Sequence, residues 1–373
     1  MDFYVIIGGG GFLGAHIISA LQRNGFRNRI IVIDPKPHYF RTIKYDRKQV
    51  TCIRKSFLDP QLLDEVLPGA SAVFHLAAMG HIGMSAGDKK LVHNFNVLGT
   101  KLLVEKCKEY NVKRFLYASS VAVCFVGEPL YNINESDPLP EPGKYLDHYS
   151  ASKAEAEKYV ISQSTPKFKT VCLRFRAIYG PEDPNVTHKV ANLIRNGLFI
   201  GMVSVHGRES ISNASSVVNC AKAFVLSDRM LQKANGIHGR AYFIMDGENT
   251  GQYCFWLPLV LALGRKPPSL QIPYEFMKTI TPYFEQFCYG FLKVPPLLTK
   301  FELSILATDN TYSIERARQE LGYEPEPSLM PEVAKYYEQL EQLHLATASM
   351  IEWRILIGFI ICFSFLLCVF LSI

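Results

Sequence analysis

Strands and helices alternate along the N-terminal half of the chain, and this alternation limits the folds it can adopt. Six short runs have the apolar, β-branched and aromatic composition of strands: Phe3–Ile7, Arg29–Ile33, Val50–Ile53, Ala72–Leu76, Arg114–Ala118 and Thr170–Phe175. The segments between them have helical spacing, at Gly14–Asn24, Pro60–Leu67, Lys90–Tyr110 and Tyr149–Ser162. This pattern predicts an α/β fold, a doubly wound parallel sheet of the Rossmann type with helices on both faces.

The second half of the chain has a looser pattern, which predicts a smaller lobe beside this sheet. We expect a helix near Val186–Gly197, a strand near Ala241–Met245 and a C-terminal unit near Thr311–Leu340. The predicted organisation is a Rossmann core at residues 1–181 and a second lobe at residues 182–345. This division leaves room for some strands and helices of the lobe to return to the core.

The C-terminal end is strongly apolar. Ile355–Ile373 is nineteen residues without a charge, just enough for a helix to cross a bilayer core of about 30 Å. We therefore expect a C-terminal transmembrane helix at residues 353–373 that tethers the body of the protein to membrane lipid, with a buried C-terminal helix as the alternative. No basic region or cleavage site marks the N-terminus, so a signal peptide is not expected.

A second apolar stretch, Tyr274–Phe291, carries seven aromatic residues and is interrupted by Pro282 and Gly290. It is too broken for a good transmembrane span. Two interpretations remain open at this stage. The stretch is either a pair of helices at the bilayer surface or a core helix of the second lobe.

Charge and cysteine content exclude some classes of protein. The net charge of +6 matches the local surplus in Lys36–Lys55, where seven Lys and Arg residues face one Asp. That stretch is either a contact for a phosphate or an anionic membrane, or a solvated loop. No basic helix carries interleaved aromatics, so nucleic acid is not expected as a partner. Nine scattered cysteines without a C-x-x-C pair predict reduced thiols rather than a disulfide framework, and no metal site is expected.

Four consecutive glycines join the first predicted strand to the first predicted helix. Gly8 permits a tight turn, Gly11 lets the backbone approach a pyrophosphate, and Gly14 lets the helix pack closely on the strand. The N-terminus of the helix also offers unpaired N–H groups and a partial positive charge to phosphates. We therefore expect a dinucleotide cofactor to be bound here by Gly8, Gly11, Phe12, Leu13 and Gly14.

Asp34 lies twenty residues after Gly14, at the end of the second predicted strand. A carboxylate at this place accepts hydrogen bonds from ribose hydroxyls and repels a 2′-phosphate. Asp34 therefore favours NAD over NADP. Lys36 and Arg41 act in the opposite sense, because a nearby cation can offset the charge of a phosphate.

Tyr149 and Lys153 lie one helical turn apart, on the same face of a predicted helix. An ammonium beside a phenol favours the phenolate and lowers its pKa from about 10, which makes the tyrosine a better base. The preceding strand ends in Ser119-Ser120, and the carboxyl ends of parallel strands line the crevice where such sheets bind ligands. These residues predict a proton-transfer site beside the nucleotide.

Taken together, these motifs resemble the extended short-chain dehydrogenase/reductases, and within them the 3β-hydroxysteroid dehydrogenase/isomerase group. The resemblance covers roughly residues 2–345 and is densest up to residue 181. The residues that carry it are Gly8…Gly11…Gly14, Asp34, Phe74-His75-Leu76-Ala77-Ala78, Asn96-Val97-Leu98-Gly99-Thr100, Ser119-Ser120, Tyr149…Lys153, Ile178-Tyr179-Gly180-Pro181 and Tyr312-Ser313-Ile314-Glu315-Arg316-Ala317…Glu320-Leu321-Gly322-Tyr323.

The resemblance implies a role for each catalytic residue. Tyr149 is the general acid/base, and Lys153 lowers its pKa and holds the nicotinamide ribose. Ser120 hydrogen-bonds the reacting oxygen, with Ser119 as the alternative, and Asn96 holds a water that links Lys153 to solvent. The remaining cofactor residues implied are those where the chain passes the adenosine-side ribose, Ala77 and Ala78.

The resemblance also implies the reaction, a hydride transfer from the 3β-hydroxyl of a sterol or steroid to NAD, with or without Δ5–Δ4 isomerisation. The alternatives are a sterol-4-carboxylate 3-dehydrogenase or another lipid-alcohol dehydrogenase and, in another class, a catalytically silent nucleotide-binding protein. The expected location is the endoplasmic reticulum membrane with the catalytic domain facing the cytosol, with a mitochondrial membrane as second choice. A homodimer is a further expectation.

Three departures from the family pattern bear on the substrate. Lys55-Ser56 replaces the usual Gly-Asp after the third strand, and Asp59 comes three residues too late to replace it. Phe175 stands where the family has proline, and Asn213–Ser216 replaces a His-Val-Asp-like element. We therefore expect changes in the adenine contact, on the nicotinamide side and in substrate choice.

Overall fold

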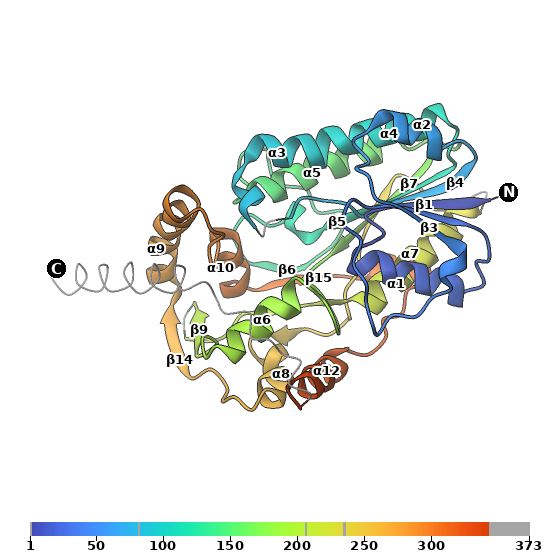
Figure 1. The fold of residues 1–373 in the computed structure, drawn as a ribbon. Coiled ribbons are helices and arrows are strands. Elements are labelled where there is room, and N and C mark those ends of the chain that lie inside the picture. Colours follow the sequence, from blue (N-terminus) through green and yellow to red (C-terminus); the bar gives the residue numbers. More distant parts are fainter. Residues whose placement is uncertain (1, 81–82, 206, 234–235, 343–373) are drawn as a thin grey trace.

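A seven-stranded parallel sheet forms the centre of the molecule (Figure 1). The structure is a computed structural model and describes residues 2–80, 83–205, 207–233 and 236–342. The strand order is β3-β2-β1-β4-β5-β7-β12. Because the order reverses between β1 and β4, the carboxyl ends of these two strands open a crevice. The strands are β1 (Phe3–Ile7), β2 (Ile30–Ile33), β3 (Val50–Ile53), β4 (Ala70–His75), β5 (Arg114–Ser120), β7 (Lys169–Phe175) and β12 (Arg240–Phe243).

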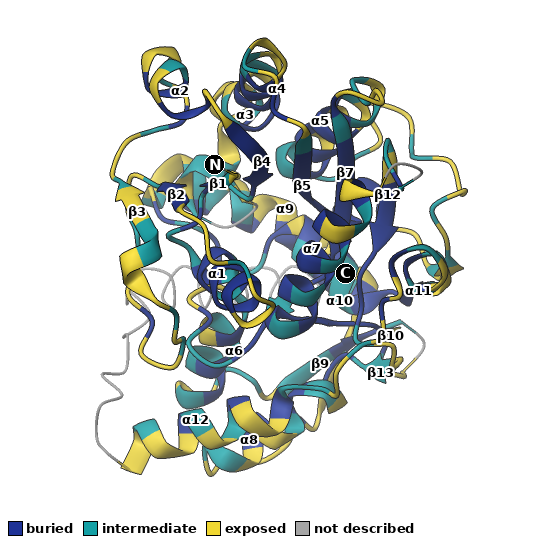
Figure 2. Ribbon diagram, turned by 90° about the vertical axis from the view of Figure 1, so that its right-hand side faces the viewer, coloured by how far each residue is buried: buried dark blue, intermediate teal, exposed yellow. Residues whose placement is uncertain are grey.

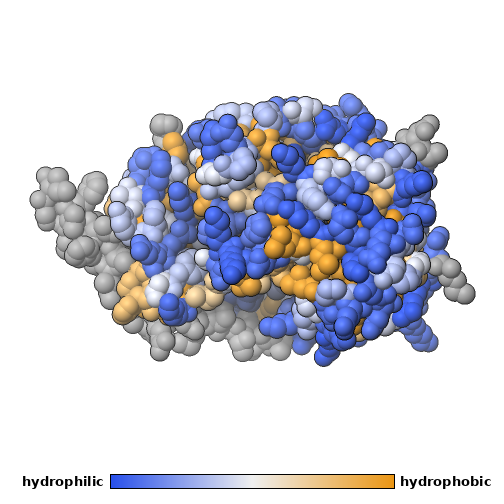
Figure 3. All heavy atoms as spheres, turned by 90° about the horizontal axis from the view of Figure 1, so that it is seen from above, coloured by the Kyte–Doolittle hydropathy of each residue, from blue (hydrophilic) through white to orange (hydrophobic). Residues whose placement is uncertain are grey.

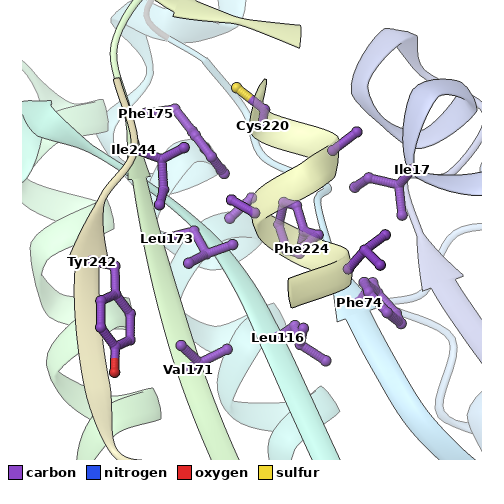
Figure 4. Packing of buried hydrophobic residues seen from close by; sticks show 14 of the residues in the cluster. Ile17, Phe74, Leu116, Val171, Leu173, Phe175, Cys220, Phe224, Tyr242 and Ile244 are labelled. Atoms are coloured by element: carbon purple, nitrogen blue, oxygen red, sulfur yellow. The ribbon is translucent and has the colours of Figure 1, made fainter. Parts of the chain in front are cut away.

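Both faces of the sheet contribute side chains to the core, because successive residues of each strand point to opposite sides. On β1, Ile6 packs in the cluster that contains Phe74 and Phe224, whereas Val5 packs in a second cluster on the other face. Figure 4 shows the first cluster, with Phe224 of a helix lying against side chains from neighbouring strands. The near-continuous apolar runs in the sequence reflect this two-sided burial.

Helices cover both faces, as predicted, and the sheet between them is buried except at its edge strand β3, which is partly exposed (Figures 1 and 2). Helices α1 (Phe12–Arg23) and α7 (Val217–Gln232) pack together on one face. The other face is covered by α2 (Pro60–Val66), α3 (Lys89–His93), α4 (Gly99–Glu109) and α5 (His148–Ser162). Seen from above, mostly hydrophilic side chains face the solvent, and hydrophobic ones gather in an area among them (Figure 3). The expected Rossmann-type sheet is therefore confirmed.

The predicted fold class is corrected in one respect, the C-terminal transmembrane helix. Within the part of the chain that the structure describes, no helix combines the length and the apolar character that crossing a membrane requires. The helix on which this expectation was placed, at residues 353–373, lies outside the described residues. A transmembrane helix is accordingly not part of the fold class established here.

The second lobe is built from short strands and peripheral helices, at the left and bottom of Figure 1. A four-stranded sheet has the order β13-β10-β15-β6, and β11-β8 and β14-β9 are two-stranded sheets. Their strands are β6 (Leu130–Ile133), β8 (Ile178–Tyr179), β9 (Gly201–Ser204), β10 (Ile211–Ser212), β11 (Ser215–Ser216), β13 (Thr250–Gly251), β14 (Leu270–Pro273) and β15 (Asn310–Tyr312). The helices are α6 (Val186–Arg195), α8 (Leu257–Ala262), α9 (Tyr274–Phe287), α10 (Lys300–Ala307) and α12 (Met330–Gln342), whereas α11 (Glu315–Leu321) packs against α7 and β12 of the core.

Two segments from the second half of the chain belong to the central sheet rather than to this lobe. Strand β12 pairs with β7 at one edge of the sheet, and α7 covers the face shared with α1. Phe224 of α7 and Tyr242 of β12 are fully buried there. The chain therefore leaves the core after β7 and returns to complete it.

The aromatic stretch forms α9 and a following π-helical turn, Cys288–Leu292. Its inner face, with Met277 and Ile280, packs against α10 and β9. Its outer side exposes Tyr283 and Phe291, which are 66% and 76% exposed. The stretch is thus a helix of the second lobe, and contact of its outer side with a bilayer stays a prediction.

The seven cysteines within the described part of the chain are free thiols, and five of them are buried. This arrangement agrees with the predicted absence of a disulfide framework. Burial raises the pKa of Cys107, Cys172 and Cys220, so these thiols stay protonated and pack as small apolar groups.

Candidate active site

The glycine loop is pressed between the strand ends and α1. Gly8 has a positive φ of 76°, and a Cβ atom added there would lie 2.8 Å from the backbone nitrogen of Ala77. At Gly14 an added Cβ would lie 2.5 Å from Cα of Gly9. Both positions therefore require glycine, as the sequence predicted. Because no side chain fills the loop at these positions, a cradle stays open above the N-terminus of α1.

A cleft of about 560 Å³ runs over this loop and across the carboxyl ends of the strands. It brings together every residue predicted to bind the cofactor, and the predicted serine with them. They are Gly8, Gly11, Phe12, Leu13, Gly14, Asp34, Ala77, Ala78, Ser120, Tyr149 and Lys153. The chain thus gathers a phosphate cradle, a carboxylate and a Tyr–Lys pair in one elongated cleft, which has the parts that a dinucleotide needs.

Asp34 lies at the end of β2, on the wall of this cleft. Its Oδ1 accepts a hydrogen bond of 2.9 Å from the backbone nitrogen of Lys36, which holds the carboxylate in place. Within the described residues, neither Lys36 nor Arg41 forms an ion pair with it; the backbone nitrogen of Arg41 instead donates to Glu182. The carboxylate is therefore placed to receive ribose hydroxyls, the arrangement that favours NAD.

Ser119 and Ser120 point to opposite sides of β5 because they are consecutive residues of one strand. Ser119 is buried, and its hydroxyl donates to Oε2 of Glu157 on α5 over 2.6 Å. Both serines line the cleft, and the Ser120 side chain, on the other side of β5 from Glu157, forms a hydrogen bond with Tyr149. Of the two serines left open by the sequence, Ser120 is the one that can reach a substrate oxygen.

Tyr149 and Lys153 lie on α5, with Asp147 as the N-cap that begins the helix. Burial lowers the pKa of Lys153 to about 7, and its ammonium donates to the carbonyl of Ala118 over 2.7 Å. Burial raises the pKa of Tyr149 to about 12, and the hydrogen bond from Ser120 opposes this by favouring the phenolate. Lys153 is not among the groups that shift the pKa of Tyr149 here, so its predicted role in lowering that pKa stays a prediction.

Asn96 lies outside the cleft lining, in a π-helical turn that interrupts the helix predicted at Lys90–Tyr110. Its side chain bonds the backbone nitrogen and carbonyl of Met79 over 2.8 and 2.9 Å, and donates to Ser152 over 2.9 Å. These bonds fasten the loop after β4 to α5. The structure thus gives Asn96 a clamping role, and its predicted part in holding a water stays untested.

A second, apolar chamber of about 200 Å³ opens beside the first cleft. The two share Ser120, Tyr149, Ala177 and Val186 in their walls. The far walls are mainly hydrophobic side chains from the second lobe, among them Trp256 and Phe301. Ser120 and Tyr149, the residues predicted to act on the substrate hydroxyl, therefore lie at the junction of a nucleotide-sized cleft and an apolar chamber.

Some lining residues were missed by the sequence analysis or serve differently than expected. Ser56, of the Lys55-Ser56 pair that stands where the family has Gly-Asp, lines the cleft; Phe57, which was not anticipated, lines it too and stacks edge-on against His75. Asp59 is the N-cap of α2 and accepts from the backbone of Gln61, so it serves the helix. A capping pattern, Asp59 followed by Pro60, was the sequence signal for this role.

Fold and site together define a nucleotide-binding dehydrogenase of the extended short-chain type. The family model described as the 3-beta hydroxysteroid dehydrogenase/isomerase family matches residues 5–274, and the chain belongs to this family. It is an oxidoreductase that uses NAD and acts on a CH–OH group. The glycine cradle and Asp34 fit that cofactor.

Two relatives and one solved structure illustrate the similarity. The chain is 34% identical to the Caenorhabditis elegans 3beta-hydroxysteroid dehydrogenase/Delta(5)-Delta(4) isomerase 1, over 83% of this chain and 66% of that protein. It is 26% identical to the human decarboxylating sterol-4-alpha-carboxylate 3-dehydrogenase, over 86% and 83%. The fold resembles Thermus thermophilus UDP-glucose 4-epimerase in complex with NAD, with a TM-score of 0.67, 21% identity and coverage of 90% and 98%.

Proposed function

We propose that the protein oxidises the 3β-hydroxyl of a sterol or steroid with NAD. The observation that carries this proposal is the position of Ser120 and Tyr149 in the shared wall of the cofactor cleft and the apolar chamber. The chamber wall is mainly apolar and therefore suits a flat hydrocarbon skeleton. A hydroxyl group placed at the junction would lie beside both residues. The names of the two relatives support a sterol-type substrate.

In this mechanism the protein orients the alcohol and moves one proton. The glycine loop and Asp34 would hold NAD, which would supply the hydride acceptor. Tyr149 takes the proton from the substrate hydroxyl, and Ser120, hydrogen-bonded to Tyr149, fixes the same oxygen. Lys153 is buried and donates to the carbonyl of Ala118 near the C-terminal end of β5. When it is protonated, it supplies a positive charge there.

The test is NADH formation by the purified full chain with a panel of 3β-hydroxysterols, their 3α-epimers and sterol 4-carboxylates. We expect turnover with 3β-alcohols and little with the 3α-epimers. Preference for the 4-carboxylates would favour the second candidate reaction, that of a sterol-4-carboxylate 3-dehydrogenase. Nucleotide binding without turnover of any alcohol would contradict the proposal and favour a silent binding protein.

Isomerisation and location are separate proposals. A Δ5 substrate that is oxidised and also isomerised yields a conjugated enone, whose ultraviolet absorbance rises with the NADH signal; absence of that absorbance would limit the reaction to oxidation. The endoplasmic reticulum, with a mitochondrial membrane as second choice, remains the predicted location. Imaging of the tagged full chain with organelle markers checks it.

A further inference from the structure

Arg176 is a buried cation that the mechanism does not use. It follows β7, directly after Phe175, whose register partner in the sheet is Ser120. Its side chain is 6% exposed and lines the apolar chamber that also holds Ser120 and Tyr149. A charged group in such a wall calls for a physical explanation, because burying a charge without a counter-charge is costly.

Among the residues that the structure describes, the hydrogen bonds of the guanidinium go only to neutral acceptors. Its Nε donates to Oδ1 of Asn310 over 2.6 Å, and its Nη1 donates to the carbonyl of Asn213 over 2.9 Å. These two bonds use two of the five N–H groups that a guanidinium carries. They fix the orientation of the side chain without neutralising its charge.

Arg174, two residues earlier, shows what a neutralised arginine looks like in this protein. It is equally buried, and its Nε and Nη2 both bond the carboxylate of Glu157, the closest contact being 2.7 Å. In the described part of the chain, Arg176 has no corresponding salt bridge. Arg174 is therefore part of a structural ion pair, whereas Arg176 is a cation without a counter-charge among the described residues.

Glu302, the one carboxylate in the described wall of the chamber, is already paired. Glu302 pairs with Lys189 over 2.5 Å, and its other oxygen accepts from the backbone nitrogen of Thr299 in the capping box of α10. Together, Lys189 and Glu302 add no net charge to the chamber. Arg176 therefore leaves the apolar chamber with one net positive charge from its described lining.

Arg176 stays charged under ordinary conditions. Burial lowers its pKa to about 10, which is still well above neutral pH. The nearby Tyr312 does not neutralise it, because burial raises the pKa of that phenol and keeps it protonated. The charge is thus present when substrate enters.

We propose that Arg176 binds a carboxylate carried by the substrate, so that the preferred substrate is a sterol or steroid acid rather than a neutral sterol. This inference rests on the proposed function and specifies its substrate class. A carboxylate receives N–H groups of a guanidinium with charge-assisted hydrogen bonds. The acid group is either on the ring system near the 3-hydroxyl or on the side chain, and the substrate series below distinguishes the two.

The first experiment compares each 3β-hydroxy acid with its carboxamide, which has the same shape and no charge. One pair carries the group at C4 and another at the end of the side chain. We expect kcat/KM for one of the acids to exceed that of its carboxamide by about tenfold or more. Equal or lower values for both acids in the wild-type protein would overturn the proposal.

The second experiment uses R176M, with R176K as the conservative variant. R176M is expected to lose about 10- to 100-fold in kcat/KM on the acid and little on the carboxamide, and R176K to recover part of the loss. The matched control K189M/E302Q removes the neighbouring charges without changing the net charge, and should keep the preference for the acid. Equal losses by R176M on acid and carboxamide would show a purely structural role.

A binding measurement separates this inference from the proposed reaction. A 3-deoxy steroid acid cannot be oxidised at C3, but should raise the melting temperature of the wild-type protein with NADH, and raise it less for R176M. If no alcohol is oxidised and this shift is seen, the proposed reaction fails and the acid site stands. If the 3-deoxy acid and its carboxamide give the same shift, the acid site is refuted even when alcohols are oxidised.

Discussion

Three single residues of the cofactor cleft are predicted to carry out proton transfer. Ser120, Tyr149 and Lys153 come from β5 and α5, and the alternation of β5 decides which serine side chain bonds Tyr149 and which bonds Glu157. This choice could have been made from the sequence, because Ser119 shares the parity of the buried Phe115 and Tyr117, whose side chains pack toward α5. The pKa shifts of Tyr149 and Lys153 could not have been predicted from the sequence, because they depend on how deeply each group is buried.

Replacing Tyr149 by phenylalanine removes the hydroxyl that accepts the substrate proton. We expect kcat for alcohol oxidation to fall by about 10²- to 10⁴-fold, the usual contribution of a positioned acid/base group. Nucleotide affinity, measured by fluorescence titration with NADH, should change little. Retention of the wild-type kcat would show that another group takes the proton.

The pH dependence follows from the pKa of Tyr149, which burial raises to about 12. Oxidation needs the phenolate, so kcat/KM should rise with pH from neutral upward; reduction of the ketone needs the phenol and should not rise in this way. The hydrogen bond from Ser120 lowers this pKa. Ser120→Ala should therefore move the rising limb of the oxidation profile to higher pH, and a shift to lower pH would contradict the assignment.

At the scale of elements, the contact between the glycine loop and α1 determines the shape of the phosphate cradle. Gly14→Ala would place a Cβ atom 2.5 Å from the backbone of Gly9 and force the helix away from the loop. We expect a loss of about 1–3 kcal/mol in stability, the usual cost of overpacking, and a higher KM for NAD. Urea denaturation and steady-state kinetics measure the two effects.

Gly290 provides the control for that substitution. An added Cβ there meets no atom within 4 Å, and its φ is not positive. Gly290→Ala should leave stability and KM for NAD nearly unchanged. Backbone entropy alone would make either substitution slightly stabilising, so an equal loss of stability at both glycines would contradict the contact with Gly9 as its cause.

For the molecule as a whole, the buried Arg174–Glu157 pair connects β7 to α5, and Ser119 of β5 donates to the same carboxylate. Glu157→Ala would leave the guanidinium buried without its counter-charge, which costs about 3–5 kcal/mol. Thermal or urea unfolding measures this loss.

Glu155, two residues earlier on the same helix, is the matched control. It pairs with Lys101 over 2.9 Å, but both side chains are more than one-third exposed. Exposed pairs contribute about 0–1 kcal/mol, so Glu155→Ala should unfold almost as the wild-type protein does. Equal losses at the two positions would refute a special role for the buried pair.

The sequence predicted the local pattern better than the long-range assembly. Six strands of the sheet and the residues of the glycine loop were anticipated because each depends on a few neighbouring residues. Helix α7 was missed, although Ser216 is an N-cap of the preferred type. The setting of Arg176 could not be anticipated, since its two acceptors lie 37 and 134 residues away along the chain.

The return of α7 and β12 to the central sheet has a consequence for how this chain must be made. A growing chain that has reached residue 181 already contains six of the seven strands, yet the helix that covers Phe74, Leu116 and Leu173 has not been synthesised. Until residue 243 emerges, α1 alone covers this face in part, and one edge of the sheet has no partner strand from the chain itself. The nascent protein therefore passes through a stage in which it exposes hydrophobic surface and an unpaired strand edge. At this stage it can bind chaperones or aggregate.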